Sequence, residues 1–187
     1  MFVLYLYSSD PKHANDIEQF CCLYGTDFRW LDTQRAKFIL NQQERPQLAI
    51  LYDAFQNDLS CTITTVIGFD HDSIMKEAID MAVNLREGRM LDIGDVLLLS
   101  TINQDYKVLN ACKELINQIP NDILKTAQMY LLTQGNAQEA AKLLYLHRNS
   151  FTYRLNKFIQ LSKIDIRESS LMSFLHIYFT LQQVESY

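Results

Sequence analysis

The stretch Asn136–Leu155, NAQEAAKLLYLHRNSFTYRL, decides the expected fold of the C-terminal part of the chain. Asn136 is a helix N-cap residue, and Glu139, three positions later, can complete a capping box, so a helix is expected to begin here. After a short connection at Tyr145–His147, a second helix is expected over about Arg148–Ser162. Two helices joined this tightly must cross at a steep angle, which is the geometry of a helix-turn-helix.

The second of these helices is amphipathic. At about 100° per residue, Phe151, Leu155 and Phe158 share one sector, which we expect to face a core. Small Ala141 in the first helix allows a close approach, and Leu146 turns the connection inward. The opposite sector is polar and is expected to face a binding partner; it contains Asn149, Tyr153, Asn156, Lys157 and Gln160.

The distribution of charge indicates the partner. The net charge of the 187-residue chain is −5, which taken alone argues against nucleic acid. Residues 1–120 hold 10 basic and 17 acidic side chains, whereas residues 121–187 hold 7 and 5. Within residues 136–163, 5 basic side chains accompany 1 acidic side chain. A local basic surface is what phosphate binding requires, so double-stranded DNA is the expected partner.

Asn149 has two interpretations at this point. Its amide can bond adenine bidentately in a major groove, where the first turn of such a helix lies. Alternatively, Asn149 or Ser150 caps the second helix, and the helix pair is an ordinary packing motif.

Pro120 marks the expected boundary between two domains, residues 1–120 and 121–187. The first mixes strand and helix patterns and the second is all helical, so the expected fold class is α+β. Strands are expected over Phe2–Tyr7, Lys37–Leu40, Leu48–Tyr52, Cys61–Gly68 and, as a further short strand, Asp95–Leu99. Helices are expected over Ser73–Glu87, Asp105–Ile119 and Ile123–Thr133, the last closed by a C-cap at Gly135.

Residues Asn136–Leu155 resemble the C-terminal helix-turn-helix of PucR/CdaR-type bacterial transcription regulators. The segment Leu144–Leu155, LYLHRNSFTYRL, is similar to the family pattern L-Y-V-H-R-N-T-L-x-Y-R-L almost residue by residue. The resemblance extends over about Asp122–Gln183, and it implies a regulator that binds operator DNA.

The resemblance assigns the recognition role to His147, Arg148, Asn149, Ser150, Tyr153 and Arg154. Together with the helical pattern, it gives the expected DNA-binding residues, which are Arg148, Asn149, Ser150, Thr152, Tyr153, Arg154 and Lys157. Ser150 and Phe151 replace the threonine and leucine of the pattern, and neither change removes a needed property. Thr152 stands where longer polar or basic residues are common in the family. Tyr145 stands where many other helix-turn-helix proteins have glycine.

The N-terminal part is similar to the degenerate GGDEF-like regulatory domain that often precedes this module, chiefly over residues 66–68, 73–87 and 90–99. No GGDEF or related acidic signature occurs in the sequence. The carboxylates that would place a nucleotide and a metal are therefore missing, and we expect no enzyme activity and no cofactor.

Three other features have two interpretations each. Asp70–Asp72 can hold a metal, but acids just before a helix usually cap its free N–H groups, so no metal is expected. Cys21 and Cys22 can sense redox state, but no activating basic cluster lies nearby, so buried, reduced thiols are expected. The apolar run Phe2–Tyr7 is too short for a membrane span and lacks the basic flank of a signal, which favours a strand in a cytoplasmic protein.

These observations predict a cytoplasmic transcription regulator that binds DNA through residues 121–187, with residues 1–120 as a regulatory or dimerisation domain for an unidentified small-molecule effector. A homodimer is expected because most helix-turn-helix proteins read two half-sites. An apolar stripe on the last helix either pairs two chains or, as we favour, closes a core; it consists of Leu171, Phe174, Leu175, Tyr178 and Leu181. Two alternatives stay open: a protein-interaction adaptor that docks through the helical module, and a nucleotide or small-molecule sensor in the α/β domain.

Overall fold

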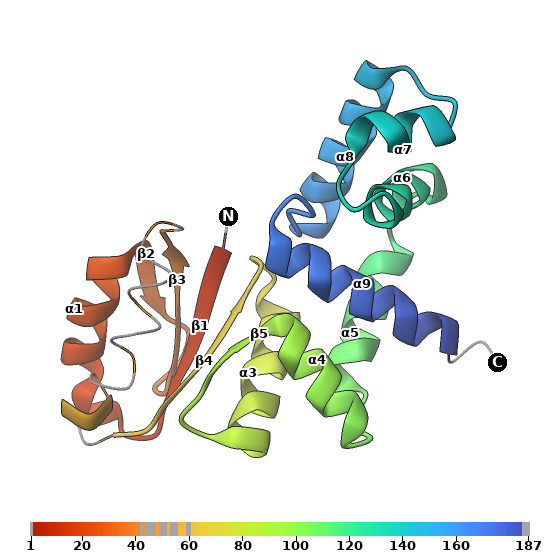
Figure 1. Ribbon diagram of the computed structural model, residues 1–187. Helices are drawn as coiled ribbons and strands as arrows, with labels where there is room; N and C mark the ends of the chain where they lie inside the picture. The colour runs from red at the N-terminus through yellow and green to blue at the C-terminus, as the bar shows by residue number, and fades with distance from the viewer. Residues whose placement is uncertain are drawn as a thin grey trace. The chain divides into compact units, whose positions relative to one another are not determined.

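The chain divides into two compact units, Met1–Gln104 and Asp105–Tyr187. The computed structural model describes residues 2–41, 43, 48, 52, 56–58 and 61–184. The first unit contains a five-stranded sheet, whereas the described part of the second is helical (Figure 1), so the expected α+β class is confirmed. The boundary between the two units lies before α5 (Lys107–Asn117), so α5 belongs to the helical unit. The sequence instead indicates a domain boundary at Pro120, after this helix.

Strand β1 (Phe2–Ser8) is the centre of the sheet. It pairs antiparallel with β3 (Arg35–Leu40) on one side and with β4 (Ile63–Gly68) on the other. β2 (Gly25–Trp30) adds to β3, and the short β5 (Met90–Asp92) adds to β4 in parallel. The resulting order is β2-β3-β1-β4-β5.

Alternate residues of β1 point to opposite faces of this sheet. Leu4 faces α1 (Ala14–Tyr24), because it lines the same apolar cavity as Phe20 and Cys21. Tyr5 faces α3 (Asp72–Arg86), because its hydroxyl donates a hydrogen bond to Asp72. Figure 1 shows these two helices on opposite sides of the sheet.

Three of the expected strands, over Phe2–Tyr7, Lys37–Leu40 and Cys61–Gly68, correspond to β1, β3 and β4. Of the strand expected over Leu48–Tyr52, residues 49–51 lie outside the described residues, and Leu48 and Tyr52 are themselves helical. Helix α1 and strands β2 and β5 were not expected from the sequence.

The strand expected over Asp95–Leu99 is wrong, because these residues lie in α4 (Ile93–Ile102). The backbone N–H of Asp92 donates to the Asp95 carboxylate at 3.1 Å, which satisfies a donor at the start of the helix. Val96 and Leu97 are both buried, so the apolar run has no alternation that distinguishes a buried helix from a strand.

The helical unit continues with α6 (Asn121–Leu132), α7 (Ala137–Leu143), α8 (Arg148–Ser162) and α9 (Ser169–Val184). The apolar stripe on α9 is covered within the chain, since four of its five residues are buried and Leu181 is only partly exposed. The stripe is therefore not a free surface for pairing two chains. Among the described residues, no helix combines the length and the apolar character needed to cross a membrane.

Candidate nucleic-acid interface

Helix α7 begins where the sequence predicts. The side-chain oxygen of Asn136 accepts a hydrogen bond from the Glu139 backbone N–H at 3.1 Å, so the N-cap is confirmed. The returning half of the capping box differs: Glu139 accepts from the side-chain amide of Asn136, whose backbone N–H donates instead to Thr133 at 3.0 Å.

The end of α6 differs from the expected C-cap at Gly135, because the C-cap is Thr133, two residues earlier. Gln134 takes the left-handed conformation that follows the helix, with φ 52°, and Gly135 continues the turn with φ 84°. The Gly135 N–H donates to the carbonyl of Tyr130 at 2.9 Å. The cap is therefore a Schellman-type end in which two consecutive residues have positive φ.

The start of α8 excludes a capping role for Asn149 and Ser150. His147 is the N-cap, and its Nδ1 accepts from the Asn149 backbone N–H at 3.3 Å. Asn149 and Ser150 lie inside the first turn, so neither caps the helix. The exposed Asn149 side chain makes no hydrogen bond within the described part of the chain, which leaves its amide available to an external partner.

The inner face of α8 is apolar, as expected. Phe151, Leu155 and Phe158 are buried, and the Phe151 ring lies 6.4 Å from that of Tyr130 on α6. Ser162 is also buried and donates its hydroxyl to the carbonyl of Phe158. This packing fixes which side of α8 remains exposed.

We call the polar side of α8 the recognition face. Five of its members are exposed and two are partly buried. In chain order, the recognition face consists of Arg148, Asn149, Ser150, Thr152, Tyr153, partly buried Arg154 and partly buried Lys157. The structure thus places all seven predicted residues on the surface of one helix. They are spread around its solvent-facing side and do not form a single line along it.

The two flanks of the recognition face have different surroundings. Arg148 and Thr152 border a hollow of about 550 Å³ between α7 and α8, which Gln138 and Lys142 also line. On the other flank, Arg154 Nη2 lies 3.5 Å from the Asp122 carboxylate of α6. Lys142 and Gln138 were not among the predicted residues; their i, i+4 spacing on the first helix is the signal that places them on one side of it.

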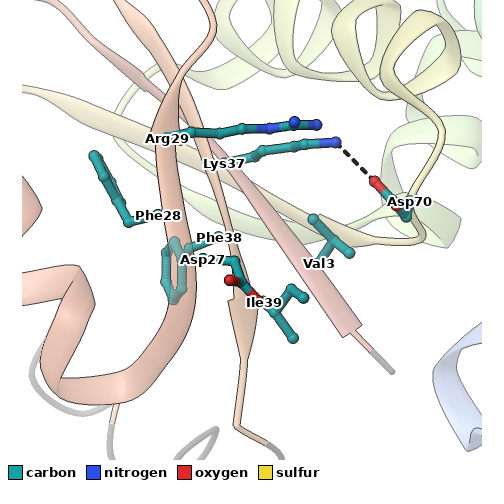
Figure 2. A pocket seen from close by; sticks show the side chains of 8 residues that line it. All are labelled: Val3, Asp27, Phe28, Arg29, Lys37, Phe38, Ile39 and Asp70. Atoms are coloured by element: carbon teal, nitrogen blue, oxygen red, sulfur yellow. Dashed lines mark hydrogen bonds and ion pairs between the residues drawn. The ribbon is translucent and has the colours of Figure 1, made fainter.

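A second polar site lies in the first unit, where the sequence predicted none. A hollow of about 450 Å³ is lined by Arg29, Lys37 and Asp70. Figure 2 shows Arg29 and Lys37 extending from neighbouring strands toward the side of Asp70. We call it the sheet hollow. Val3 and Ile39 form part of its apolar lining.

The charges of the sheet hollow are largely paired. The Lys37 side chain is only 7% exposed, and its ammonium donates to Asp70, Asp72 and the hydroxyl of Tyr5. Partial burial alone would raise the pKa of Asp72, but the hydrogen bonds from Lys37 and Tyr5 outweigh it and lower that pKa. Burial, and then the bond to Asp72, raise the pKa of Tyr5. These bonds connect the start of α3 to the sheet.

Asp70–Asp72 therefore act differently from the expected acidic cap. His71 is the N-cap of α3, and its Nδ1 accepts from the Ile74 N–H at 3.4 Å, whereas both aspartates accept from Lys37. Among the described residues, no group of three His, Cys, Asp or Glu side chains is placed to hold a metal ion.

The cysteines agree only in part with the expectation of buried thiols. Cys21, Cys61 and Cys112 are buried, and burial raises the pKa of each, to about 12 for Cys112. Cys22 is exposed, so the expectation is wrong for this residue.

Part of the helical unit matches a known family of domains. Residues 123–180 match the PucR C-terminal helix-turn-helix domain, so the resemblance of this region to that domain is confirmed. The match covers α7, the connection and α8 together.

Curated relatives match part of this chain and are themselves longer. The chain is 37% identical over 91 residues to the uncharacterized protein YxkF of Bacillus subtilis, covering 48% of this chain and 30% of that protein. It is 30% identical over 66 residues to PutR, a proline-responsive transcriptional activator of the same organism, covering 35% of this chain and 15% of PutR. The chain thus spans about a third or less of the curated relatives that it matches.

One solved structure is similar over the whole chain. The crystal structure of a regulator of polyketide synthase expression from Bifidobacterium adolescentis aligns with a TM-score of 0.50 and 14% identity, covering 100% of this chain and 81% of that chain. At this identity, the similarity concerns the fold alone.

Proposed function

We propose that this protein is a transcription regulator that binds operator DNA sequence-specifically by inserting the first turns of α8 into the major groove. The observation that carries the proposal is the recognition face. Arg148, Asn149 and Tyr153 are exposed near the start of a helix whose opposite side is anchored in a core. In a helix-turn-helix, these positions contact base edges and the adjacent phosphates.

Charge supports the same surface. Five of the seven basic side chains of residues 121–187 lie between 136 and 163, where Glu139 is the only acid. Lys142 and Arg148 both border the hollow between α7 and α8, where their charges are available to a phosphate. Because residues 1–120 carry net negative charge, the helical unit is the part of the chain that attracts DNA.

The first unit serves as a regulatory or dimerisation domain in this proposal, which agrees with the similarity of its sequence to the degenerate GGDEF-like regulatory domain. The protein acts in the cytoplasm as a homodimer, and its half-sites lie about 10 base pairs or a multiple apart, since a two-fold protein reads a two-fold operator. The sheet hollow is the site that we assign to an effector, because it combines an apolar lining with the partly exposed guanidinium of Arg29. No enzymatic step is proposed.

Two variants of the full chain separate base reading from phosphate binding. Asn149→Ala should cost about 1–3 kcal/mol at the preferred site and relax the base preference there, because a bidentate contact is lost. Lys157→Ala should weaken binding to all sequences. It should also reduce the salt slope, which is the slope of the logarithm of the binding constant against the logarithm of salt concentration, by about one unit. Lys12→Ala is the control, since it removes an exposed charge of the first unit.

The measurement is a fluorescence anisotropy titration with selected genomic duplexes at several salt concentrations. An unchanged ranking of sequences with Asn149→Ala would remove this residue as a base reader. If the wild-type chain shows no salt-dependent binding to any duplex, the protein is better described as an adaptor that docks through its helical unit.

A further inference from the structure

The connection between α7 and α8 contains an aromatic residue in a conformation that suits glycine. Tyr145 has φ 54°, in the left-handed region. Its N–H donates to Lys142 at 3.1 Å, and the N–H of Leu146 donates to Ala141 at 2.9 Å. This is the Schellman arrangement, in which the left-handed residue is usually glycine because a Cβ is unfavourable there.

The side chain of Tyr145 gains nothing from folding that offsets this strain. It is 97% exposed, the highest value among the exposed large hydrophobic side chains. Within the described part of the chain, its ring makes no ring contact and its hydroxyl makes no hydrogen bond. The other described non-glycine residues with positive φ are polar or charged: Asp27, Gln104, Gln134 and Lys163. Strain combined with full exposure points to a contact outside the chain.

The neighbours of Tyr145 indicate what this contact is. The residue lies three positions after Lys142 and three before Arg148, both of which are exposed and basic. It also lies two residues before His147, the N-cap of α8, whose first turn carries Asn149. A surface of this charge attracts a phosphate backbone, and a tyrosine hydroxyl is a common donor to phosphate oxygens.

We infer that the Tyr145 hydroxyl donates a hydrogen bond to a DNA phosphate at the edge of the groove that α8 enters. The inference rests on the proposed DNA-binding function and adds a residue to it. Tyr145 is uncharged, so it neutralises no phosphate. Its loss therefore weakens binding to all sequences alike without the change in salt slope that follows the loss of a lysine.

Two variants of the full chain test this inference, because both remove the hydroxyl but only one removes the strain. Tyr145→Phe keeps the ring and the backbone strain, whereas Tyr145→Gly removes the ring and relieves the strain. Both should weaken DNA binding about tenfold, because a hydrogen bond to a charged group is lost. The salt slope should change by less than about half a unit in both, against about one unit for Lys157→Ala.

Thermal melting separates a contact from a structural role. Tyr145→Phe should melt as the wild type does, and Tyr145→Gly should melt at the same temperature or up to about 4 °C higher. Tyr106→Phe is the matched control, since it removes a partly exposed hydroxyl outside the helix-turn-helix and should leave DNA binding unchanged.

Wild-type affinity in Tyr145→Phe would overturn the inference. A lowered melting temperature in Tyr145→Phe would also overturn it, because the hydroxyl would then support the fold. Neither result affects the proposed function, which fails only if the wild-type chain itself does not bind DNA.

Discussion

Arg154 is the one member of the recognition face that is held by an acid. Its guanidinium lies 3.5 Å from the carboxylate of Asp122, which is more than half exposed. A surface pair of this kind contributes little stability, about 0–1 kcal/mol. The same carboxylate opposes a phosphate that approaches Arg154, so the ion pair competes with DNA.

Asp122→Asn should therefore raise DNA affinity by about two- to fivefold with little change in thermal stability, because one repulsive charge is removed and Arg154 is released. Anisotropy titrations at low and moderate salt measure the effect. Asp16→Asn is the control, since it makes the same change in net charge in the first unit, at another exposed aspartate. An equal gain in both variants would show that only net charge matters.

Asp72 connects stability to pH. Its pKa is lowered in the folded chain because the hydrogen bonds from Lys37 and Tyr5 outweigh the opposing effect of partial burial. A carboxyl group with a lowered folded pKa contributes stability above its unfolded pKa, about 3.9, and loses that contribution as pH falls through the folded value.

The stability difference between the wild type and Asp72→Asn should therefore be constant near neutral pH and should shrink below about pH 4. Melting temperatures of both proteins across this range measure it. A difference that stays constant down to the acid limit of the folded state would contradict the role of the Asp72 charge.

The short helix α7 depends on its cap more than the longer helices do. It has 7 residues, so the hydrogen bond from the Glu139 N–H to Asn136 satisfies a large share of its free donors. Asn136→Ala should lower the free energy of unfolding by about 1 kcal/mol in urea denaturation, whereas Asn136→Asp, which keeps an acceptor, should lower it much less. Equal losses in the two variants would show that the cap is not the cause.

Helices α7 and α8 and strands β1, β3 and β4 were predictable from sequence, whereas α4 and the edge strand β2 were not. Asn136 fixed the start of α7 to the residue, and the predicted second helix agrees with α8 at both ends. The apolar residues of α4 gave no periodicity to distinguish helix from strand. The edge strand β2 contains an irregularity between Thr26 and Arg29 that breaks the alternation on which strand prediction depends.

At the scale of the molecule, the recognition face was predictable because its residues follow one another on a single helix. The sheet hollow was not, since Arg29, Lys37 and Asp70 are separated along the chain and meet only through strand pairing and the turn after β4. Pairing register is a property of the folded sheet, and a shift of one residue would move Lys37 to the other face. A site of this kind requires the structure.

The two units should also separate in function when the chain is divided. The contact division at Gln104 places α5 with the helical unit, and the buried residues of α5 include Val108, Leu109 and Cys112. Fragment 105–187 should therefore fold and bind duplex DNA with an affinity close to that of a single full-length chain for the same duplex, whereas fragment 1–104 should not bind DNA.

Fragment 121–187, which begins at the boundary that Pro120 indicates, should bind the same sequences as fragment 105–187. It should unfold at a lower temperature, because it lacks the apolar face of α5. Circular dichroism melting and anisotropy titration of the three fragments measure both properties. DNA binding by fragment 1–104 alone would contradict the assignment of DNA contacts to α8. Equal melting temperatures for fragments 105–187 and 121–187 would show that α5 contributes nothing to the stability of the helical unit.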